Sequence, residues 1–271
     1  MAISLASLNR LSAPKPPRIV IYGPHGIGKN SFAGSAPRPV LINIEDGHPS
    51  GQPIDAFPKA ENFQDVMDAM AALYAELHDF ETLVVDSLDW LEPLVWAETV
   101  RRNNVANPSK PWASIEDAGY GRGFVATLDV WREYLDAINA LRNDKGMAVI
   151  QTAHAEVKRF DSPETEPFDR YQIKLHEKAA AIVQEQCDIV AFGNYRVSIS
   201  KSDVGFNKKV ARAVGGAQRV VFLEERPAFH AKNRYSLPAS VDLPGVPDAW
   251  KQPQLIWDAF ARHLPETTTG A

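Results

Sequence analysis

Short apolar runs rich in β-branched residues alternate along this chain with segments whose apolar residues recur every three or four positions. The short runs predict buried β-strands, at 19–22, 40–44, 82–86, 147–152 and 188–193. The helical spacing predicts amphipathic helices, at 63–77, 124–141, 173–184 and 252–263. Strands that alternate with helices predict an α/β fold, with one mostly parallel sheet and helices on both of its faces.

The period shifts from helical to strand-like between Tyr195 and Glu224, which predicts a β-hairpin followed by one further strand. This C-terminal part should extend the sheet in antiparallel fashion. Between Gly193 and Arg219, six basic residues against the single acid Asp203 give a net charge of +5: Arg196, Lys201, Lys208, Lys209, Arg212 and Arg219. Such charge is typical either of a sheet edge that repels pairing with another strand or of a surface that binds nucleic acid.

Two other segments lack periodicity and are predicted as loops, at 101–122 and 155–172. The first interleaves cations with aromatic residues, as single-strand binders do, and it also fits a solvated surface excursion. The second is long for a loop in a compact domain, which indicates a functional or disordered segment.

We expect one domain over residues 18–264, preceded by an extended arm at 1–17 and followed by a flexible tail at 265–271. Three prolines near the end of the arm favour extended backbone. The arm is either a frayed terminus or a segment that docks on a neighbouring subunit.

Composition narrows the class of protein. The net charge of −5 for 271 residues leaves −10 outside the basic segment, so any affinity for nucleic acid must be local. Cys187 is the only cysteine, which excludes an intramolecular disulfide and fits a reducing cytoplasm. No apolar run has the length of a membrane span, so we expect no membrane association.

The most specific motif is G-x-x-x-x-G-K, from Gly23 to Lys29, between a predicted strand and a predicted helix. Its glycines let successive backbone N–H groups turn inward and form a nest for phosphate oxygens, and the lysine adds a mobile charge. We therefore predict a nucleoside-triphosphate site, with ATP and Mg²⁺ as cofactors. Its residues are Gly23, Pro24, His25, Gly26, Ile27, Gly28, Lys29, Asn30, Ser31 and Asp86.

Three of these residues are predicted to complete the Mg²⁺ shell. Asn30 stands where such motifs have Ser or Thr, and an amide oxygen can also coordinate the metal. Ser31 follows it. Asp86 ends the strand Thr82–Asp86, the Walker B pattern, whose aspartate holds the shell of the metal.

Polar residues also end two other predicted strands. Glu45 follows the strand at 40–44, and His154 follows the strand at 147–152. The carboxyl ends of strands are where α/β sheets bind ligands, although a plain strand boundary and a structural histidine would look the same.

Together these motifs resemble the RecA-type recombinase core, a P-loop ATPase with an AAA-type domain, over roughly residues 18–240. The chain is most similar to the short nucleotide-binding proteins that phages encode as recombinases or annealing factors. In RecA-like proteins a catalytic glutamate lies in a segment like FIDAEHA. The segment VLINIEDG implies that Glu45 is this base, and His154 occupies the place of the glutamine that senses the γ-phosphate.

The segment AKNRYSLP resembles the RecA stretch V-K-N-K, whose two cations reach the γ-phosphate of a neighbouring protomer. The resemblance implies that Lys232 and Arg234 act in trans, within a head-to-tail filament or ring. It also implies that the segments 101–122 and 155–172 are DNA-binding loops.

These features predict an ATP-dependent, single-stranded-DNA-binding recombinase or annealing protein of phage type, acting in the host cytoplasm as a homo-oligomer. We expect a Mg²⁺-dependent, DNA-stimulated ATPase, whose further partner could be a single-strand-binding protein. The expected DNA contacts are Arg101, Arg102, Lys110, Arg122, Lys158, Arg159, Arg170, Lys208, Lys209 and Arg212. The alternative is a nucleotide-gated, DNA-associated scaffold or loader in which Asn30 limits turnover. A metabolic P-loop kinase would need lid arginines that we do not identify.

Overall fold

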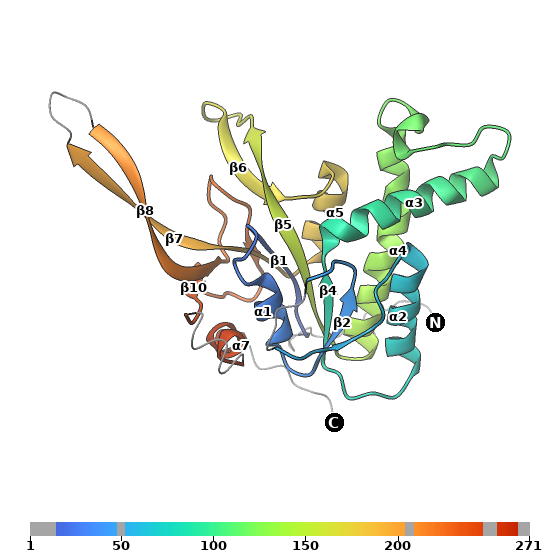
Figure 1. Ribbon diagram of the computed structural model, residues 1–271, viewed down its shortest axis with the longest axis horizontal. Helices are drawn as coiled ribbons and strands as arrows, with labels where there is room; N and C mark the ends of the chain where they lie inside the picture. The colour runs from blue at the N-terminus through green and yellow to red at the C-terminus, as the bar shows by residue number, and fades with distance from the viewer. Residues whose placement is uncertain (1–14, 48–51, 204–208, 246–253, 265–271) are drawn as a thin grey trace, which may run out of the picture.

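The computed structural model describes residues 15–47, 52–203, 209–245 and 254–264. Its centre is a ten-stranded mixed sheet with the order β10-β8-β7-β1-β5-β4-β2-β3, to which β6 and β9 pair at the side (Figure 1). The strands are β1 (Arg18–Gly23), β2 (Pro39–Asn43), β3 (Asp55–Ala56), β4 (Thr82–Asp86), β5 (Ala148–Phe160), β6 (Phe168–Ile173), β7 (Ile189–Asp203), β8 (Lys209–Phe222), β9 (Lys232–Asn233) and β10 (Ser240–Asp242).

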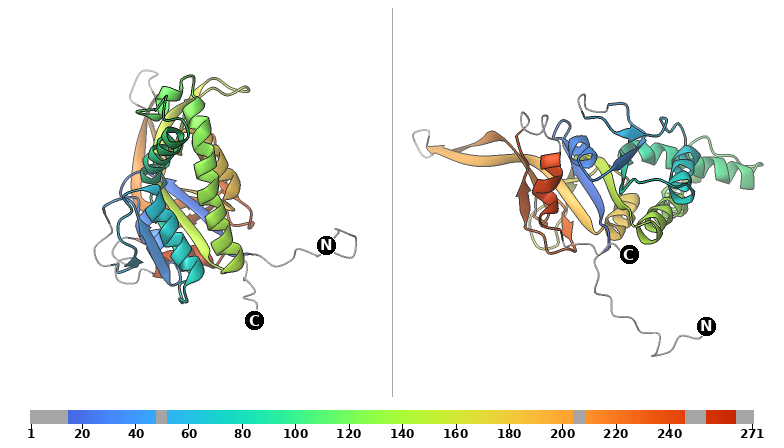
Figure 2. Two further views of the ribbon diagram at one scale, coloured as in Figure 1. Left: turned by 90° about the vertical axis from the view of Figure 1, so that its right-hand side faces the viewer. Right: turned by 90° about the horizontal axis from the view of Figure 1, so that it is seen from below.

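Both faces of the sheet are covered by helices (Figure 2). These are α1 (Lys29–Gly34), α2 (Phe63–Ala75), α3 (Leu88–Ala106), α4 (Arg122–Asp144), α5 (Glu177–Gln186) and α7 (Gln254–Ala261). Along β1, Val20 and Tyr22 pack into the core under α2 to α5, whereas Ile19 and Ile21 pack into the core that α1 and α7 share. The predicted α/β fold with helices on both faces is thus confirmed.

Strand β5 explains why the segment 155–172 was wrongly predicted as a loop. Up to His154 the strand runs parallel to β1, and from Ala155 it pairs antiparallel with β6. The hairpin β5/β6 projects from the sheet (Figure 1), so most of its side chains stay partly or fully exposed and the apolar alternation that marks a buried strand is missing. Backbone pairing, and the Phe160–Phe168 ring contact at 5.4 Å, hold it instead.

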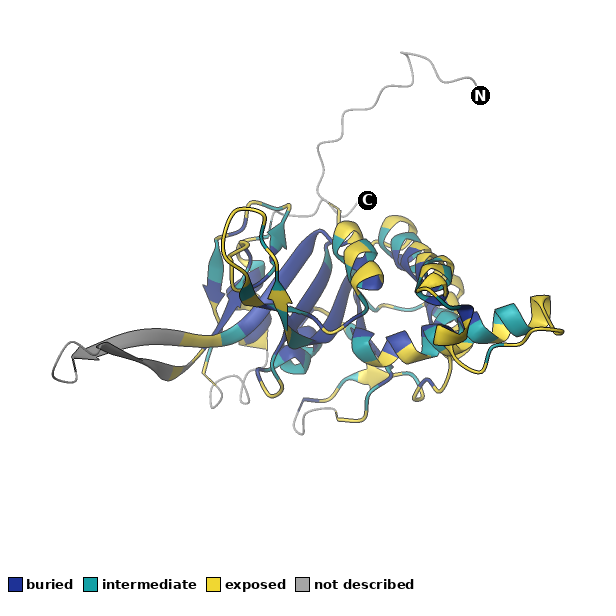
Figure 3. Cartoon of the chain, turned by 90° about the horizontal axis from the view of Figure 1, so that it is seen from above, coloured by how far each residue is buried: buried dark blue, intermediate teal, exposed yellow. Residues whose placement is uncertain are grey.

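The segment 101–122 also differs from the predicted loop. Helix α3 continues through Arg101 and Arg102 to Ala106, because both guanidinium groups pair with Glu98, one turn earlier. A short 3-10 helix η2 (Ile115–Ala118) follows, and α4 begins at Arg122. Most of this excursion is exposed (Figure 3), and its helical parts carry no apolar stripe that the sequence could have revealed.

The predicted antiparallel extension is confirmed as one long ribbon of β7 and β8, which reaches beyond the sheet (Figure 1). The prediction of a separate strand after the hairpin is wrong, since β8 continues without interruption through Gly215 and Gly216 to Phe222. Glycine tolerates extended backbone, so this pair does not interrupt the strand.

The proposed boundaries of the domain stay a prediction. Residues 1–14 of the expected arm and the tail 265–271 lie outside the described residues, as does Lys208. The end of the arm lies against α4, where the Pro16 carbonyl accepts a hydrogen bond from Arg142 Nε at 2.7 Å. Among the described helices, none combines the length and the apolar character that crossing a bilayer would require.

A buried carboxyl group makes stability depend on pH. Glu92 of α3 accepts hydrogen bonds from the His176 backbone N–H at 3.0 and 3.1 Å, and burial raises its pKa to about 7. The folded state therefore binds a proton that the unfolded state, with the ordinary value of 4.5, releases. The stabilisation is complete below pH 4.5 and is lost as the pH rises through 7, by up to about 3 kcal/mol.

We expect Glu92→Gln to remove this dependence, because the amide stays neutral at every pH. Urea denaturation between pH 4 and 8 should show a free energy of unfolding that falls with pH in the wild type, relative to the variant. Glu76→Gln, the same change at an exposed glutamate, should leave the profile unchanged. Parallel profiles for the wild type and Glu92→Gln would contradict the assignment.

Candidate nucleotide-binding site

The phosphate-binding loop connects β1 to α1 at the carboxyl end of the central strands. Gly23 must be glycine because a Cβ there would lie 2.2 Å from the Gly193 carbonyl oxygen on β7. Gly28 has a φ of 98°, a left-handed conformation that bulkier residues rarely adopt. The loop backbone therefore depends on its glycines, and its amide groups can approach a phosphate chain closely.

Lys29 is buried at the mouth of this loop. Its Nζ donates to the carbonyl oxygens of Gly23 and Pro24, both at 3.2 Å. Burial lowers the pKa of this amine, and the nearby carboxylates of Asp89 and Asp86 counteract the effect. The ammonium group can exchange two neutral acceptors for anionic phosphate oxygens, which are the stronger partners.

Asp86 lies directly beside the loop. Its carboxylate accepts hydrogen bonds from Asn30 Nδ2 at 2.6 Å and from the Thr152 hydroxyl. Burial raises the pKa of Asp86, while the Thr152 hydroxyl, Lys29 and Asn30 lower it in part. Because the Asn30 amide group uses its nitrogen here, its oxygen is the atom left for a metal ion.

The donor set fits Mg²⁺ when the ion arrives together with phosphate oxygens. The described residues contain no group of three His, Cys, Asp or Glu side chains that could hold an ion alone. Mg²⁺ at nucleotide sites keeps several waters and needs only one or two protein ligands besides the phosphates. The Asp86 carboxylate, the Asn30 amide oxygen and the Ser31 hydroxyl are of the required hard oxygen type.

Glu45 and His154 meet at the same edge. Ser87 donates from its hydroxyl to Glu45 Oε2 at 3.0 Å, and His154 Nδ1 lies 4.0 Å from that oxygen. The side chain of Glu45 is 24% exposed, so water can reach it. A carboxylate fixed by one bond and open to solvent is suited to orienting a water molecule.

His154 is itself fixed by Asp89 of α3. The His154 backbone N–H donates to Asp89 Oδ1 at 3.0 Å, and Nδ1 lies 2.9 Å from Oδ2. Burial raises the pKa of Asp89, but the hydrogen bonds from His154 outweigh it and leave the value below the ordinary one. An ionised carboxylate only accepts, so Nδ1 carries the proton. The imidazole ring packs against that of His25 in the phosphate-binding loop, with ring centroids 4.1 Å apart and the ring planes tilted by 31°.

Sequence reasoning missed the roles of Asp89 and Thr152, although a signal was present. Thr152 and His154 are two residues apart on β5, which puts their side chains on the same face of the strand. Polar residues in that spacing at the carboxyl end of a buried strand indicate a shared site. Ser87 and Asp89 stand at the start of α3, where such residues usually act as helix caps, yet Ser87 makes no side-chain capping bond.

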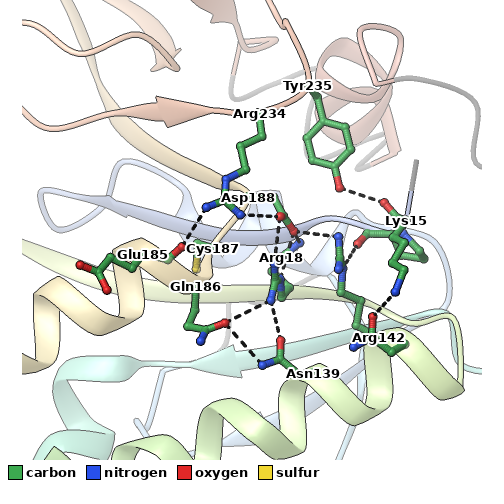
Figure 4. A network of polar contacts seen from close by, with 12 residues as sticks. Lys15, Arg18, Asn139, Arg142, Glu185, Gln186, Cys187, Asp188, Arg234 and Tyr235 are labelled. Carbon is green, nitrogen blue, oxygen red and sulfur yellow. Dashed lines mark hydrogen bonds and ion pairs between the residues drawn. The ribbon is translucent and has the colours of Figure 1, made fainter. Parts of the chain in front are cut away.

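Lys232 and Arg234 lie at the opposite, amino-terminal edge of the strands. Asp188 lies between three guanidinium groups there (Figure 4), at 2.9 Å from Arg18, 3.2 Å from Arg142 and 3.4 Å from Arg234. Lys232 donates to the carbonyl oxygens of Gln184 and Glu185 at the end of α5. These two cations therefore do not contact the phosphate-binding loop of the same chain.

The residues predicted to contact DNA are spread over several elements. Arg101 and Arg102 pair with Glu98, Lys158 pairs with Glu156, and Arg159 pairs with Asp161. Arg170 is a correction: it is 5% exposed and pairs with Glu225, so DNA cannot reach it. Lys110 and Arg122 are exposed, and Lys209 and Arg212 are described as members of β8.

Comparison with known proteins identifies the family. The family model described as the AAA domain matches residues 15–235. The crystal structure of the RadB recombinase is similar at 14% sequence identity and a TM-score of 0.45, over 85% of this chain and 87% of that chain. The comparison with curated proteins gives no match. The chain therefore belongs to the AAA domain family, and its phosphate-binding loop is that of a P-loop nucleotide-binding domain.

Proposed function

We propose that this protein is an ATP-dependent, single-stranded-DNA-binding recombinase or annealing protein of phage type, with ATP at the interfaces between protomers. The observation that supports this most is the contact chain at the carboxyl edge of the sheet. It joins His25 of the phosphate-binding loop to His154, and His154 to the base of the β5/β6 hairpin. A site built only to bind nucleotide has no need of such a link to a projecting hairpin.

The chain's own residues divide the work as follows. The loop amides and Lys29 bind the phosphates, while Asp86, Asn30 and Ser31 would hold Mg²⁺, which neutralises charge on the phosphate oxygens. Glu45, fixed by Ser87, orients the attacking water and accepts its proton. Each residue acts on a different atom of the same reaction, which is the division of roles that phosphoryl transfer requires.

His154 is proposed as the relay between nucleotide and DNA. A phosphate that displaces His25 or attracts the His154 ring would act on the residue where β5 leaves β1 and joins β6. The His154 carbonyl oxygen also accepts from the Lys174 backbone N–H at 2.9 Å. Both strands of the hairpin are thus tied to this residue.

Arg234 is the better placed of the two cations proposed to act in trans. Its side chain is 52% exposed, and its bond to Asp188 is long, at 3.4 Å. Lys232 is bound by two α5 carbonyl oxygens and is half-buried. The two cations lie at one edge of the sheet, whereas the carboxylates and the bound phosphates lie at the other. Head-to-tail assembly would bring the cations of one subunit to the anionic site of the next, so the charges favour it.

One observation favours the alternative of a nucleotide-gated scaffold or loader. Asn30 Nδ2 binds the Asp86 carboxylate at 2.6 Å, and this bond must loosen before the same carboxylate can shape a metal shell. A weak metal shell would leave ATP as an assembly ligand with little turnover. The proposed cytoplasmic location and single-strand-binding partner are common to both alternatives.

The DNA-binding part of the proposal predicts a strong salt dependence. If the +5 ribbon neutralises about five phosphates, the logarithm of the affinity for a single-stranded oligonucleotide should fall against log salt with a slope of about −3 to −4. Fluorescence anisotropy with Mg²⁺ and ATP present measures this slope.

A paired variant sharpens this test. Lys209→Gln with Arg212→Gln should reduce the slope by about 1.4, since each lost phosphate contact contributes about 0.7. Arg132→Gln, an exposed arginine on α4 that pairs with Asp129, is the control and should change nothing. An affinity that does not depend on salt would remove the ribbon from the DNA-binding surface.

A further inference from the structure

A second cation lies against the phosphate-binding loop, and nothing in the sequence motif includes it. Arg219 of β8 is 5% exposed, and its guanidinium group packs on the backbone of Gly28. A Cβ at Gly28 would lie 2.4 Å from Arg219 Nη1. The glycine before Lys29 therefore both shapes the loop and lets an arginine from a distant strand approach it.

Arg219 is incompletely paired. Its Nη2 donates to the Pro244 carbonyl oxygen at 2.8 Å, whereas the buried Nε has no hydrogen-bond partner among the described residues. No described carboxylate forms an ion pair with it. Burial lowers the pKa of this guanidinium group, which reflects the unfavourable free energy of a desolvated charge.

Within the part of the chain that the structure describes, this buried cation has no anionic partner, an unfavourable arrangement that calls for a reason. The nearest feature that recruits an anion is the loop itself. A phosphate chain bound there brings several negative charges close to Gly28, in a poorly hydrated setting where charges interact strongly. Arg170, the other arginine that is buried among the described residues, pairs with Glu225 instead, and the partly buried Arg18 pairs with Asp188.

We propose that Arg219 is a further phosphate-binding residue of the nucleotide site, which stabilises the phosphate chain of bound nucleotide from the β8 side of the loop. The inference rests on the proposed nucleotide site. It adds to that site an arginine of the same chain, from the β7/β8 ribbon that carries the basic residues. Arg219 and the ribbon belong to the same strand, β8, so the proposed contact lies on the strand that joins the nucleotide site to the ribbon.

The test measures the affinity of ATP and of inorganic tripolyphosphate by calorimetry, together with the melting temperature of the nucleotide-free protein. Arg219→Met should weaken both ligands by the same factor, about 10–100-fold, which is typical of losing a charge-assisted contact. Its melting temperature should be unchanged or higher, because a desolvated charge has been removed. Arg219→Lys, which keeps the charge, should restore both affinities to within about fivefold.

Arg132→Met, the same change at an exposed arginine of α4, is the control and should match the wild type. Unchanged tripolyphosphate affinity in Arg219→Met would overturn the inference, as would a lowered melting temperature with no rescue by lysine, which indicates a packing role. Wild-type protein that binds neither ATP nor tripolyphosphate would instead contradict the proposed function itself.

Discussion

Glu45→Gln is expected to lower the turnover of ATP by about 10²–10⁴-fold while ATP affinity changes by less than about threefold. Glutamine keeps the shape of the side chain and can still accept the Ser87 hydroxyl at Oε. It cannot accept a proton from water, so the loss falls on the chemical step. Steady-state kcat and equilibrium binding of ATP, measured on the same preparation, separate these two effects.

Asp46→Asn is the matched control for this variant. Asp46 is the next residue in the chain, 83% exposed and paired with Lys59 rather than with the site. Its amide variant should hydrolyse ATP at the wild-type rate. Equal turnover in Glu45→Gln and the wild type would assign the base to another group.

Arg234→Ala is expected to lower the turnover of ATP by about 10³–10⁵-fold, as loss of a trans-acting arginine does in related phosphoryl transfer. Its effect on folding should be small, because the side chain is half-exposed and its ion pair with Asp188 is long. Arg38→Ala, at 53% exposure and also in surface ion pairs, controls for a general loss of surface charge.

Mixing two inactive variants tests whether Arg234 acts in trans. An interface between a Glu45→Gln protomer and an Arg234→Ala protomer can combine the intact Glu45 of one with the intact Arg234 of the other. Random mixing should then restore about one quarter of the wild-type turnover, because one in four interfaces has the intact pair. Mixtures that stay inactive would indicate that Arg234 acts within its own protomer or only on structure.

The buried elements of the fold could be predicted from the sequence. The phosphate-binding loop, the strand ending in Asp86 and the helices over 63–77 and 124–141 follow from apolar spacing and glycine chemistry, and the structure has them at nearly those positions. Burial forces an apolar pattern on such elements, so the pattern can be read.

The projecting elements could not be predicted in the same way. The β5/β6 hairpin and the end of α3 are held by backbone pairing and by ion pairs such as that of Glu98 with Arg101, which need no apolar periodicity. The site shows the same limit. Lys29 and Asp86 belong to sequence motifs that mark a nucleotide site. Arg219 belongs to no such motif and lies almost two hundred residues further along the chain, so only the folded structure reveals that it contacts the loop at Gly28.

Hydrolysis of ATP with Mg²⁺, measured with and without single-stranded DNA on the wild type and on Lys29→Ala, tests the proposed recombinase activity itself. We expect turnover that rises when DNA is added and is absent in the variant, which loses its phosphate-binding charge. Tight binding of ATP by the wild type, without turnover in either condition, would contradict the recombinase proposal and favour the nucleotide-gated scaffold, with the Asn30–Asp86 bond as its cause.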